Sequence, residues 1–275
     1  AARAFMAELG RPVMLKALAG GGGRGIRVVR DPATLDDDLA RCRSEARGAF
    51  GDDRVQAEEL IESARHVEVQ IVGDGAQVAV LGERECSLQR RHQKLIEIAP
   101  AAFLGDEMRR GLHDAAHRIG AHVGYCGLGT VEFLVAADGS AAWFLEVNPR
   151  LQVEHTVTEE ATGLDLIRLQ LRLAVGGRLA DEALPDPLAP RGMALQMRIN
   201  AETLQADGIA SPARGRITLF DLPSGGGLRA DAIGHAGYEV GLDYDALLAK
   251  LVVHVPDADP SLLFRKAYRA AGAAL

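Results

Sequence analysis

The stretch WFLEVNPRLQVEHTVTEE, residues 143–160, decides how the rest of the chain is interpreted. It begins as an apolar strand and then places polar side chains at every second position: Glu146, Asn148, Arg150, Gln152 and Glu154. Alternate side chains of an extended chain point to the same face, so we expect these five to line one wall. Burying so many polar groups is costly unless they bind a ligand or one another. The stretch therefore predicts a binding wall.

A second carboxylate faces this wall if residues 129–148 form a hairpin. An Asp-Gly dipeptide at 138–139 is a strong hairpin signal. In such a hairpin Glu132 falls nearly opposite Glu146, and opposed carboxylates repel each other. A divalent cation removes the conflict, and Glu132, Glu146 and Asn148 offer the oxygen ligands that Mg²⁺ or Mn²⁺ prefers. The alternative is that one acid is protonated or paired with an arginine.

A glycine-rich segment near the N-terminus, GGGGRG at residues 20–25, lies between two predicted strands. It formally matches a dinucleotide fingerprint, but that motif needs a helix to follow, and residues 26–30 read as a β-branched strand. A Walker A loop needs Gly-Lys-Ser/Thr, which is absent. What remains is a hairpin flap whose backbone N–H groups can close over phosphates, with Lys16 on the adjoining strand. A flexible surface hairpin is the alternative.

Two histidine-containing segments are candidate binding sites. The run QRRHQK at residues 89–94 is densely basic and favours a compact anion site, with a solvated turn as the alternative. His113 and His117 are spaced for a shared metal, but no Glu follows His113 and no third ligand is evident. We therefore expect a plain surface helix over residues 106–123.

The chain is acidic, with a formal net charge of -7 and a pI of about 5.7. It lacks the basic footprint of a nucleic-acid-binding protein. It also has no apolar run long enough to span a bilayer and no signal-peptide pattern, so we expect neither nucleic acid nor membrane as a partner. Cys42, Cys86 and Cys126 form no CxxC pair, which favours a reducing compartment. We expect the cytoplasm, or the mitochondrial matrix in a eukaryote.

Several motifs then occur in a fixed order: Lys16 with the flap, RHVEVQ at 65–70, ERECSLQRRHQK at 83–94, EVNPRLQVEHTVTE at 146–159, and MRINAE at 197–202. Together they resemble the biotin carboxylases of the ATP-grasp superfamily, over essentially the whole chain. The resemblance implies an α+β ATP-grasp fold and ATP-dependent carboxylation of biotin by bicarbonate. Bicarbonate would attack the γ-phosphate to give carboxyphosphate, and the carboxyl group would then pass to N1 of biotin.

The resemblance also implies a role for each matching residue. ATP would be bound by Lys16, Gly20, Gly21, Gly22, Gly23, Arg24, Gly25, Glu58, Ile61, His66, Gln89, His92, Leu134 and Leu145. Two Mg²⁺ or Mn²⁺ ions would be bound by Glu132, Glu146 and Asn148. Bicarbonate would be held by Lys94, Arg150, Gln152 and the Val153 backbone, with Glu154 as general base, while Arg198 would stabilise the biotin enolate. Glu59 departs from the family, which often has a lysine there near the adenine.

These roles agree with the chemistry. Phosphoryl transfer needs charge neutralisation and alignment, bicarbonate needs a base within reach, and a planar anion suits a bidentate arginine.

The resemblance divides the chain into a lid subdomain at 1–56, a catalytic core at 57–190 and a truncated C-terminal region at 191–275. The family's N-terminal Rossmann-like domain is missing, so we expect a fragment of a larger polypeptide that dimerises at full length. No Met-Lys-Met carrier motif occurs, so biotin is expected on a separate carrier domain or chain.

A carboxyltransferase partner would select the final acceptor. Residues 196–203 and 223–227 favour an acyl-CoA carboxylase. The alternatives are a pyruvate or urea carboxylase, an inactive ATP-binding fragment, or another ATP-grasp ligase such as carbamoyl-phosphate synthetase. That last enzyme lacks the RRHQK run combined with QVEH.

Overall fold

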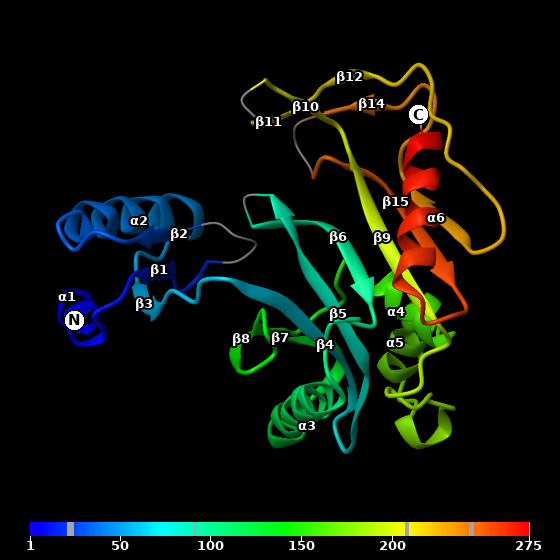
Figure 1. Ribbon diagram of the computed structural model, residues 1–275, viewed down its shortest axis with the longest axis horizontal. Helices are drawn as coiled ribbons and strands as arrows, with labels where there is room; N and C mark the ends of the chain where they lie inside the picture. Colours follow the sequence, from blue (N-terminus) through cyan, green and yellow to red (C-terminus); the bar gives the residue numbers. More distant parts are fainter. Residues whose placement is uncertain (21–24, 91, 207–208, 242–244, 275) are drawn as a thin grey trace. The chain divides into compact units, whose positions relative to one another are not determined.

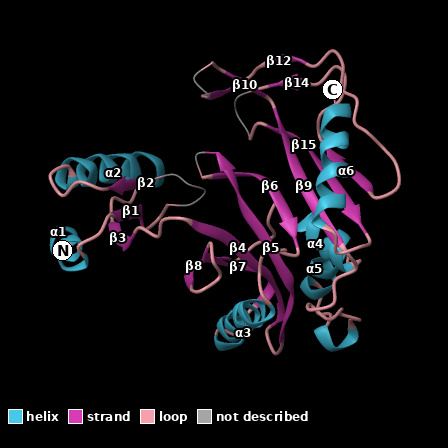
Figure 2. Ribbon diagram, in the orientation of Figure 1, coloured by secondary structure: helices cyan, strands magenta, loops and turns pink. Residues whose placement is uncertain are grey.

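The computed structural model describes residues 1–20, 25–90, 92–206, 209–241 and 245–274. Gly21, Gly22, Gly23 and Arg24 of the predicted flap lie outside the described residues. The chain folds into two compact units, Ala1–Ala64 with Gln89–Gln93 and Arg65–Leu88 with Lys94–Leu275. Figure 1 labels the elements of each unit, and Figure 2 distinguishes helices from strands.

The first unit is a three-stranded antiparallel sheet, in the order β2-β1-β3, with two helices. Its elements are α1 (Ala2–Leu9), β1 (Val13–Ala17), β2 (Ile26–Val29), α2 (Leu35–Phe50) and β3 (Val55–Glu59). Val13 and Leu15 of β1 pack in one apolar cluster with Met6 of α1 and Leu35 of α2. Because side chains alternate along a strand, Lys16 points away from this cluster. The two strands predicted on either side of the glycines are confirmed.

The second unit is built on an eight-stranded sheet in the order β13-β15-β9-β6-β5-β4-β7-β8. Its strands are β4 (Ala64–Asp74), β5 (Val78–Arg90), β6 (Gln93–Ala99), β7 (Cys126–Ala136), β8 (Ala142–Asn148), β9 (Met193–Asn200), β13 (Leu228–Ala232) and β15 (Leu247–Val255). Its helices are α3 (Asp106–His122), α4 (His155–Thr162), α5 (Leu166–Ala174), the 3₁₀ turn η1 (Leu179–Asp181) and α6 (Pro260–Ala273). Two short ribbons pair β10 (Glu202–Leu204) with β11 (Ala210–Pro212), and β12 (Gly215–Arg216) with β14 (Glu239–Val240).

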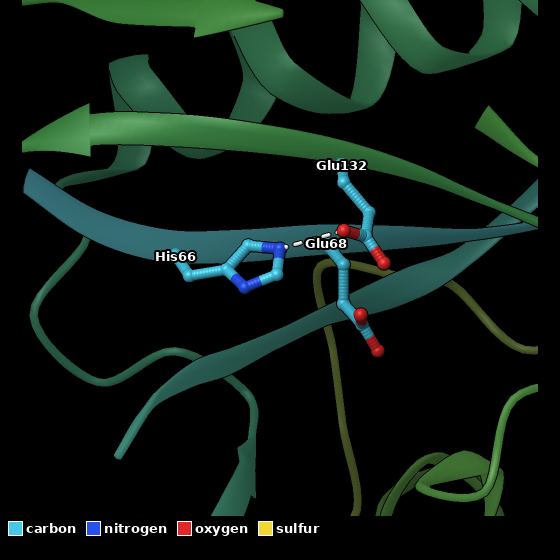
Figure 3. A group of neighbouring side chains, drawn as sticks. All are labelled: His66, Glu68 and Glu132. Atoms are coloured by element: carbon cyan, nitrogen blue, oxygen red, sulfur yellow. Dashed lines mark hydrogen bonds and ion pairs between the residues drawn. The ribbon is translucent and has the colours of Figure 1, made fainter. Parts of the chain in front are cut away.

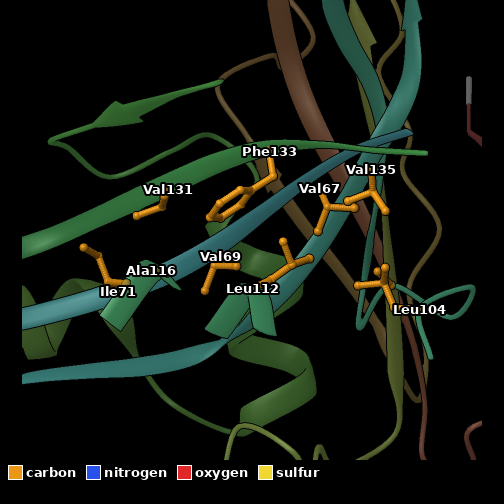
Figure 4. Packing of buried hydrophobic residues seen from close by; sticks show 10 residues of the cluster. Val67, Val69, Ile71, Leu104, Leu112, Ala116, Val131, Phe133 and Val135 are labelled. Carbon is orange, nitrogen blue, oxygen red and sulfur yellow. The ribbon is translucent and has the colours of Figure 1, made fainter. Parts of the chain in front are cut away.

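The central strands of this sheet carry apolar side chains on one face and polar ones on the other. Val67 and Val69 of β4 and Val131 of β7 pack in one core cluster with side chains of α3 (Figure 4). Their sequence neighbours Glu68 and Glu132 point to the opposite face, because successive side chains of a strand alternate. Both acids are nevertheless buried, which requires charged or polar partners on that face.

Strand β9 follows the same rule between two helices. Met193 and Leu195 pack with α6, whereas Ala194 packs with α4. Continuing the alternation, Gln196 and Arg198 lie on the α4 side of the strand. The strand thus delivers an amide and a guanidinium to the same side of the sheet as the first turn of α4.

The extended wall predicted for residues 146–154 is wrong beyond Asn148. Strand β8 ends at Asn148, and α4 begins at His155 with Glu154 as its N-cap. Pro149 follows the strand directly and has no N–H to continue a ladder. The last three polar residues of the predicted wall therefore come from a loop and a helix start.

Two helices, α4 and α5, follow the site loop. Gly163 is the C-cap of α4 and adopts the left-handed conformation (φ 76°). A Cβ at Gly163 would also lie 2.2 Å from the end of the flexible Arg191 side chain, which would have to move, so the left-handed backbone is the main reason for glycine here. Within the described residues, no helix is both long enough and apolar enough to cross a membrane.

Candidate active site

Two carboxylates face each other on neighbouring strands, as the hairpin signal predicted. Glu132 of β7 is in register with Glu146 of β8. The side-chain amide of Asn148 donates to Glu132 Oε1 at 3.0 Å and to Glu146 Oε1 at 3.3 Å. The amide of Gln152 also approaches Glu132 Oε1, at 3.4 Å. Oxygen-bearing side chains therefore converge on Glu132 from β8 and from the loop that follows it.

A histidine from the adjacent strand completes this group. His66 Nε2 is hydrogen-bonded to Glu132 Oε2 at 2.9 Å (Figure 3). His66, Glu68 and Glu132 each place a possible ligand atom within 4.8 Å of the others. Burial opposes ionisation of Glu132, but the hydrogen bond from His66 and the charge of Lys94 lower its pKa to about 2. Glu132 is therefore a carboxylate at neutral pH.

Lys94 lies at the centre of three carboxylates. Its Nζ is 2.5 Å from Glu68 Oε2, 2.7 Å from Glu154 Oε1 and 3.1 Å from Glu132 Oε1. Burial works against its charge, but these acids, Glu68 foremost, hold the pKa of Lys94 well above its usual range. Lys94 is thus a permanent cation that joins the strand acids to Glu154.

A fully buried ion pair, Arg84 with Glu68, lies next to Lys94. The Arg84 guanidinium contacts Glu68 Oε1 at 2.5 Å, and both side chains are 0% exposed. Arg84 also donates to Gln70 Oε1 and to Thr158 Oγ1, each at 2.8 Å. Sequence reasoning assigned no role to Arg84 or Glu68. Glu68 and Arg84 are directly opposite each other on β4 and β5, and the sequence could have indicated this pair only if the register of these two strands had been known.

Glu154 is held between two cations. It is 1% exposed, with Oε1 on Lys94 and Oε2 at 3.0 Å from Arg198 Nη2. Arg198 in turn contacts Glu97 Oε1 through Nε at 2.7 Å and Nη2 at 2.6 Å. Glu97 was not predicted from the sequence either. Burial, together with the charge of Glu154, raises the pKa of Glu97 to about 7 in spite of Arg198.

The loop that carries the remaining site residues is held by side-chain hydrogen bonds. Arg150 is exposed and donates to Gln152 Oε1 at 3.3 Å, while Gln152 is buried. Lys250 Nζ donates to the Val153 carbonyl at 3.3 Å. The second unit therefore links the following predicted residues through direct contacts: His66, Lys94, Glu132, Glu146, Asn148, Arg150, Gln152, Glu154 and Arg198.

The other predicted nucleotide contacts are divided between the two units. Leu134 and Leu145 are half-buried on β7 and β8 of the second unit. The following belong to the first unit: Lys16, Gly20, Gly25, Glu58, Ile61, Gln89 and His92. Gly25 adopts a left-handed conformation (φ 70°), where a Cβ would lie 2.9 Å from the Ala17 side chain. Glu59, the departure from the family, forms an ion pair with Arg11 at 2.8 Å.

The expectation of a plain surface helix is wrong for His113. It is buried, and its Nε2 is hydrogen-bonded to Glu83 Oε2 at 2.7 Å, while Arg109 contacts Glu83 Oε1 at 2.9 Å. His117 is exposed. Residues four apart share a face of a helix, and of these two histidines only His113 is packed into the core.

Comparison with known proteins agrees with this geometry. The family model for the carbamoyl-phosphate synthase L chain ATP-binding domain matches residues 1–182, and the biotin carboxylase C-terminal domain matches residues 196–270. Biotin carboxylase 1 of Populus trichocarpa is 44% identical over 257 residues, which cover 93% of this chain and 48% of that protein. Pyruvate carboxylase of Schizosaccharomyces pombe is 45% identical over 256 residues, covering 92% of this chain and 21% of the relative.

Solved structures give the same result. The biotin carboxylase domain of Hydrogenobacter thermophilus 2-oxoglutarate carboxylase, in complex with MgADP, ADP and bicarbonate, has a TM-score of 0.93 and 38% identity, covering 100% of this chain and 59% of that one. Biotin carboxylase of Campylobacter jejuni has a TM-score of 0.90 and 39% identity, covering 99% and 59%. The chain spans about half the length of the chloroplast relative. It has the α+β ATP-grasp fold and belongs to the biotin carboxylase family.

Proposed function

We propose that this chain carries out the ATP-dependent carboxylation of biotin by bicarbonate, through carboxyphosphate, as the biotin carboxylase part of an acyl-CoA carboxylase. The observation that supports this most is the placement of Glu154. A buried carboxylate held by Lys94 on one oxygen and Arg198 on the other is a fixed base beside two anion-binding groups. Deprotonation of bicarbonate needs such a base and cationic groups that bind the anion beside it.

The bicarbonate step uses the groups around Glu154. Lys94, Arg150, Gln152 and the Val153 backbone are proposed to hold the anion. Glu154 takes its proton, so that the resulting dianion can attack the γ-phosphate of ATP. Because Lys94 already neutralises Glu154 and Glu132, it keeps an incoming anion from meeting uncompensated acids. Arg198 is then proposed to stabilise the enolate of biotin before carboxyl transfer to N1.

The residues around Glu132 fit a hard divalent cation. Glu132, Glu146 and Asn148 present two carboxylates and an amide, and the amide now bridges the opposed acids. We propose that these three bind Mg²⁺ or Mn²⁺, two ions in all, which would supply charge neutralisation to the phosphates of ATP. The nucleotide is proposed to be bound by Lys16, Gly20, Gly21, Gly22, Gly23, Arg24, Gly25, Glu58, Ile61, His66, Gln89, His92, Leu134 and Leu145.

The proposal extends to organisation and partners. Residues 1–56 would form the lid, 57–190 the catalytic core and 191–275 the C-terminal region. Biotin would arrive on a carrier domain, and a carboxyltransferase would use the product; the relatives include a biotin-dependent acyl-coenzyme A carboxylase subunit and pyruvate carboxylases. The neighbour from Hydrogenobacter is described as a dimer, and we propose the same for the full-length protein, in the cytoplasm or mitochondrial matrix.

The proposal is tested by ATP hydrolysis with bicarbonate and Mg²⁺, measured with and without free biotin. Wild-type turnover should rise with biotin, and Glu154→Gln and Arg198→Ala should abolish the rise. Absence of the rise, with nucleotide binding that Lys16→Ala removes, would contradict biotin carboxylation and favour an ATP-binding fragment. ATP turnover that is independent of biotin in the wild type, Glu154→Gln and Arg198→Ala would favour another ATP-grasp ligase.

A further inference from the structure

A buried acid that no proposed step uses lies directly behind Arg198. Glu97 is on β6, in register with Gln196 of β9, and both side chains are 0% exposed. We propose that Glu97 is a positioning residue that aims the Arg198 guanidinium at Glu154 and couples its own charge to that of Glu154. This inference rests on the function proposed above, and it names a residue that controls the base and the biotin-facing arginine together.

The two oxygens of Glu97 serve different partners. Oε1 accepts from Arg198 Nε at 2.7 Å and lies 2.6 Å from Nη2. Oε2 accepts from the Gln196 side-chain amide at 2.9 Å. One oxygen that lies against two nitrogens of the guanidinium restrains the group more than a contact with one nitrogen would. The direction in which Arg198 reaches Glu154 therefore depends on Glu97.

The contacts close into a ring. Gln196 accepts a hydrogen bond from the hydroxyl of Thr156, which lies in the first turn of α4, two residues after Glu154. Glu154 itself returns to Glu97 through Arg198. Glu97 thus binds Arg198 with one oxygen. With its other oxygen it binds Gln196, which in turn contacts the start of the helix that follows Glu154. Each of these groups is buried or nearly so, so water competes weakly for the bonds.

The charges around Glu97 are unevenly balanced. Arg198 on β9 is its direct cation, Glu154 before α4 is a second acid on the same guanidinium, and Cys86 on β5 is buried with a raised pKa and so uncharged. The remaining charge on β6, Lys94, contacts other acids. Because both acids share one guanidinium, the charge of Glu154 disfavours ionisation of Glu97 and raises its pKa.

This coupling has a consequence for the reaction. When Glu154 accepts a proton from bicarbonate, its charge no longer opposes that of Glu97, whose pKa of about 7 then falls. At neutral pH the equilibrium of Glu97 then moves toward the ionised form, with its proton released to solvent, and the ionised form binds Arg198 more strongly. The guanidinium is thereby held in place while Glu154 is neutral, which is the stage at which biotin would need it.

Kinetics of the complete gene product give the first test. Glu97→Gln should lower the biotin-dependent kcat/KM about tenfold to hundredfold, the cost of one buried charged hydrogen bond, while nucleotide binding is retained. The matched control is Glu83→Gln, which removes another buried acid that contacts an arginine and should leave kcat/KM unchanged. An unchanged kcat/KM in Glu97→Gln, or an equal loss in Glu83→Gln, would overturn the positioning role.

Infrared spectroscopy tests the coupling without any turnover. A protonated-carboxyl band should disappear on titration through about pH 7 and be missing in Glu97→Gln. It should titrate at lower pH in Glu154→Gln and at higher pH in Arg198→Ala. A band that is unmoved by Glu154→Gln would overturn the inference. Should the protein show no biotin-stimulated turnover, the proposed function would fail while the infrared titration still decides the coupling.

Discussion

Replacing Arg84 by methionine tests the buried charge network beneath the site. Arg84 and Glu68 are both 0% exposed, and the guanidinium also bonds Gln70 and Thr158. Methionine fills much of the same volume but leaves the Glu68 carboxylate buried with Lys94 as its remaining cation. Breaking a buried pair on one side costs about 3–5 kcal/mol, because the orphaned charge keeps its desolvation penalty.

The expected loss is large enough to measure directly. At roughly 2–4 °C per kcal/mol for a domain of this size, the Tm should fall by about 6–20 °C. Thermal unfolding followed by circular dichroism, supported by urea titration, gives both quantities. The double variant Arg84→Met/Glu68→Gln should recover about half or more of the loss, since no unpaired charge then remains.

An exposed pair provides the matched control. Arg118 contacts Asp114 at 3.0 Å, with side chains 72% and 65% exposed. Arg118→Met should therefore leave the Tm unchanged within error, because solvent screens such a pair. If Arg84→Met cost less than about 1 kcal/mol, the pair would have to be solvated, and the account of a dry charge network would be refuted.

Three further predictions follow from single contacts. Glu97 has a raised pKa of about 7, so protonation of Glu97 stabilises the folded state fully below about pH 4.5, and this stabilisation is lost as the pH rises through 7. The free energy of unfolding of Glu97→Gln, measured with urea, should therefore rise by about 3 kcal/mol relative to wild type between pH 5 and pH 8. Lys94→Gln leaves three acids facing one another and should lower bicarbonate-dependent ATP cleavage at least about hundredfold, with Lys266→Gln unaffected. Gly192→Ala places a Cβ 2.1 Å from the Val255 carbonyl at φ 107° and should lower the free energy of unfolding by about 2–4 kcal/mol. Gly176→Ala, at φ 90° in open space, should lower it by about 1–2 kcal/mol, and equal losses in the two variants would contradict the packing at Gly192.

The hairpin that bears the opposed acids could be predicted from local signals alone. Alternating apolar residues and the Asp-Gly turn determine that Glu132 falls across from Glu146, and the structure confirms this register. The ordered motifs then indicated the family, and the resemblance predicted roles for Lys94, Glu154 and Arg198. None of these steps needs a distant contact to be known in advance.

The supporting residues could not be found this way. Arg84 meets Glu68 through the exact register of the β4–β5 hairpin, and Glu97 meets Arg198 only because β6 pairs with β9, a strand far away in the sequence. A charged residue within a strand pattern looks solvent-exposed until the opposite strand is known. The extended wall failed for a related reason. Pro149 ends the ladder, and tertiary contacts, not alternation, then bring Gln152 to Glu132 and Glu154 to Lys94.

Formation of carboxybiotin from radiolabelled bicarbonate, ATP, Mg²⁺ and free biotin tests the central claim most directly. The account predicts that label enters biotin in an ATP-dependent manner and that Glu154→Gln abolishes it. Nucleotide binding should persist in that variant, because Glu154 is not among the proposed nucleotide ligands. Label transfer that survives in Glu154→Gln would contradict the assignment of the base, and ATP cleavage without any labelled biotin in the wild type would contradict the function itself.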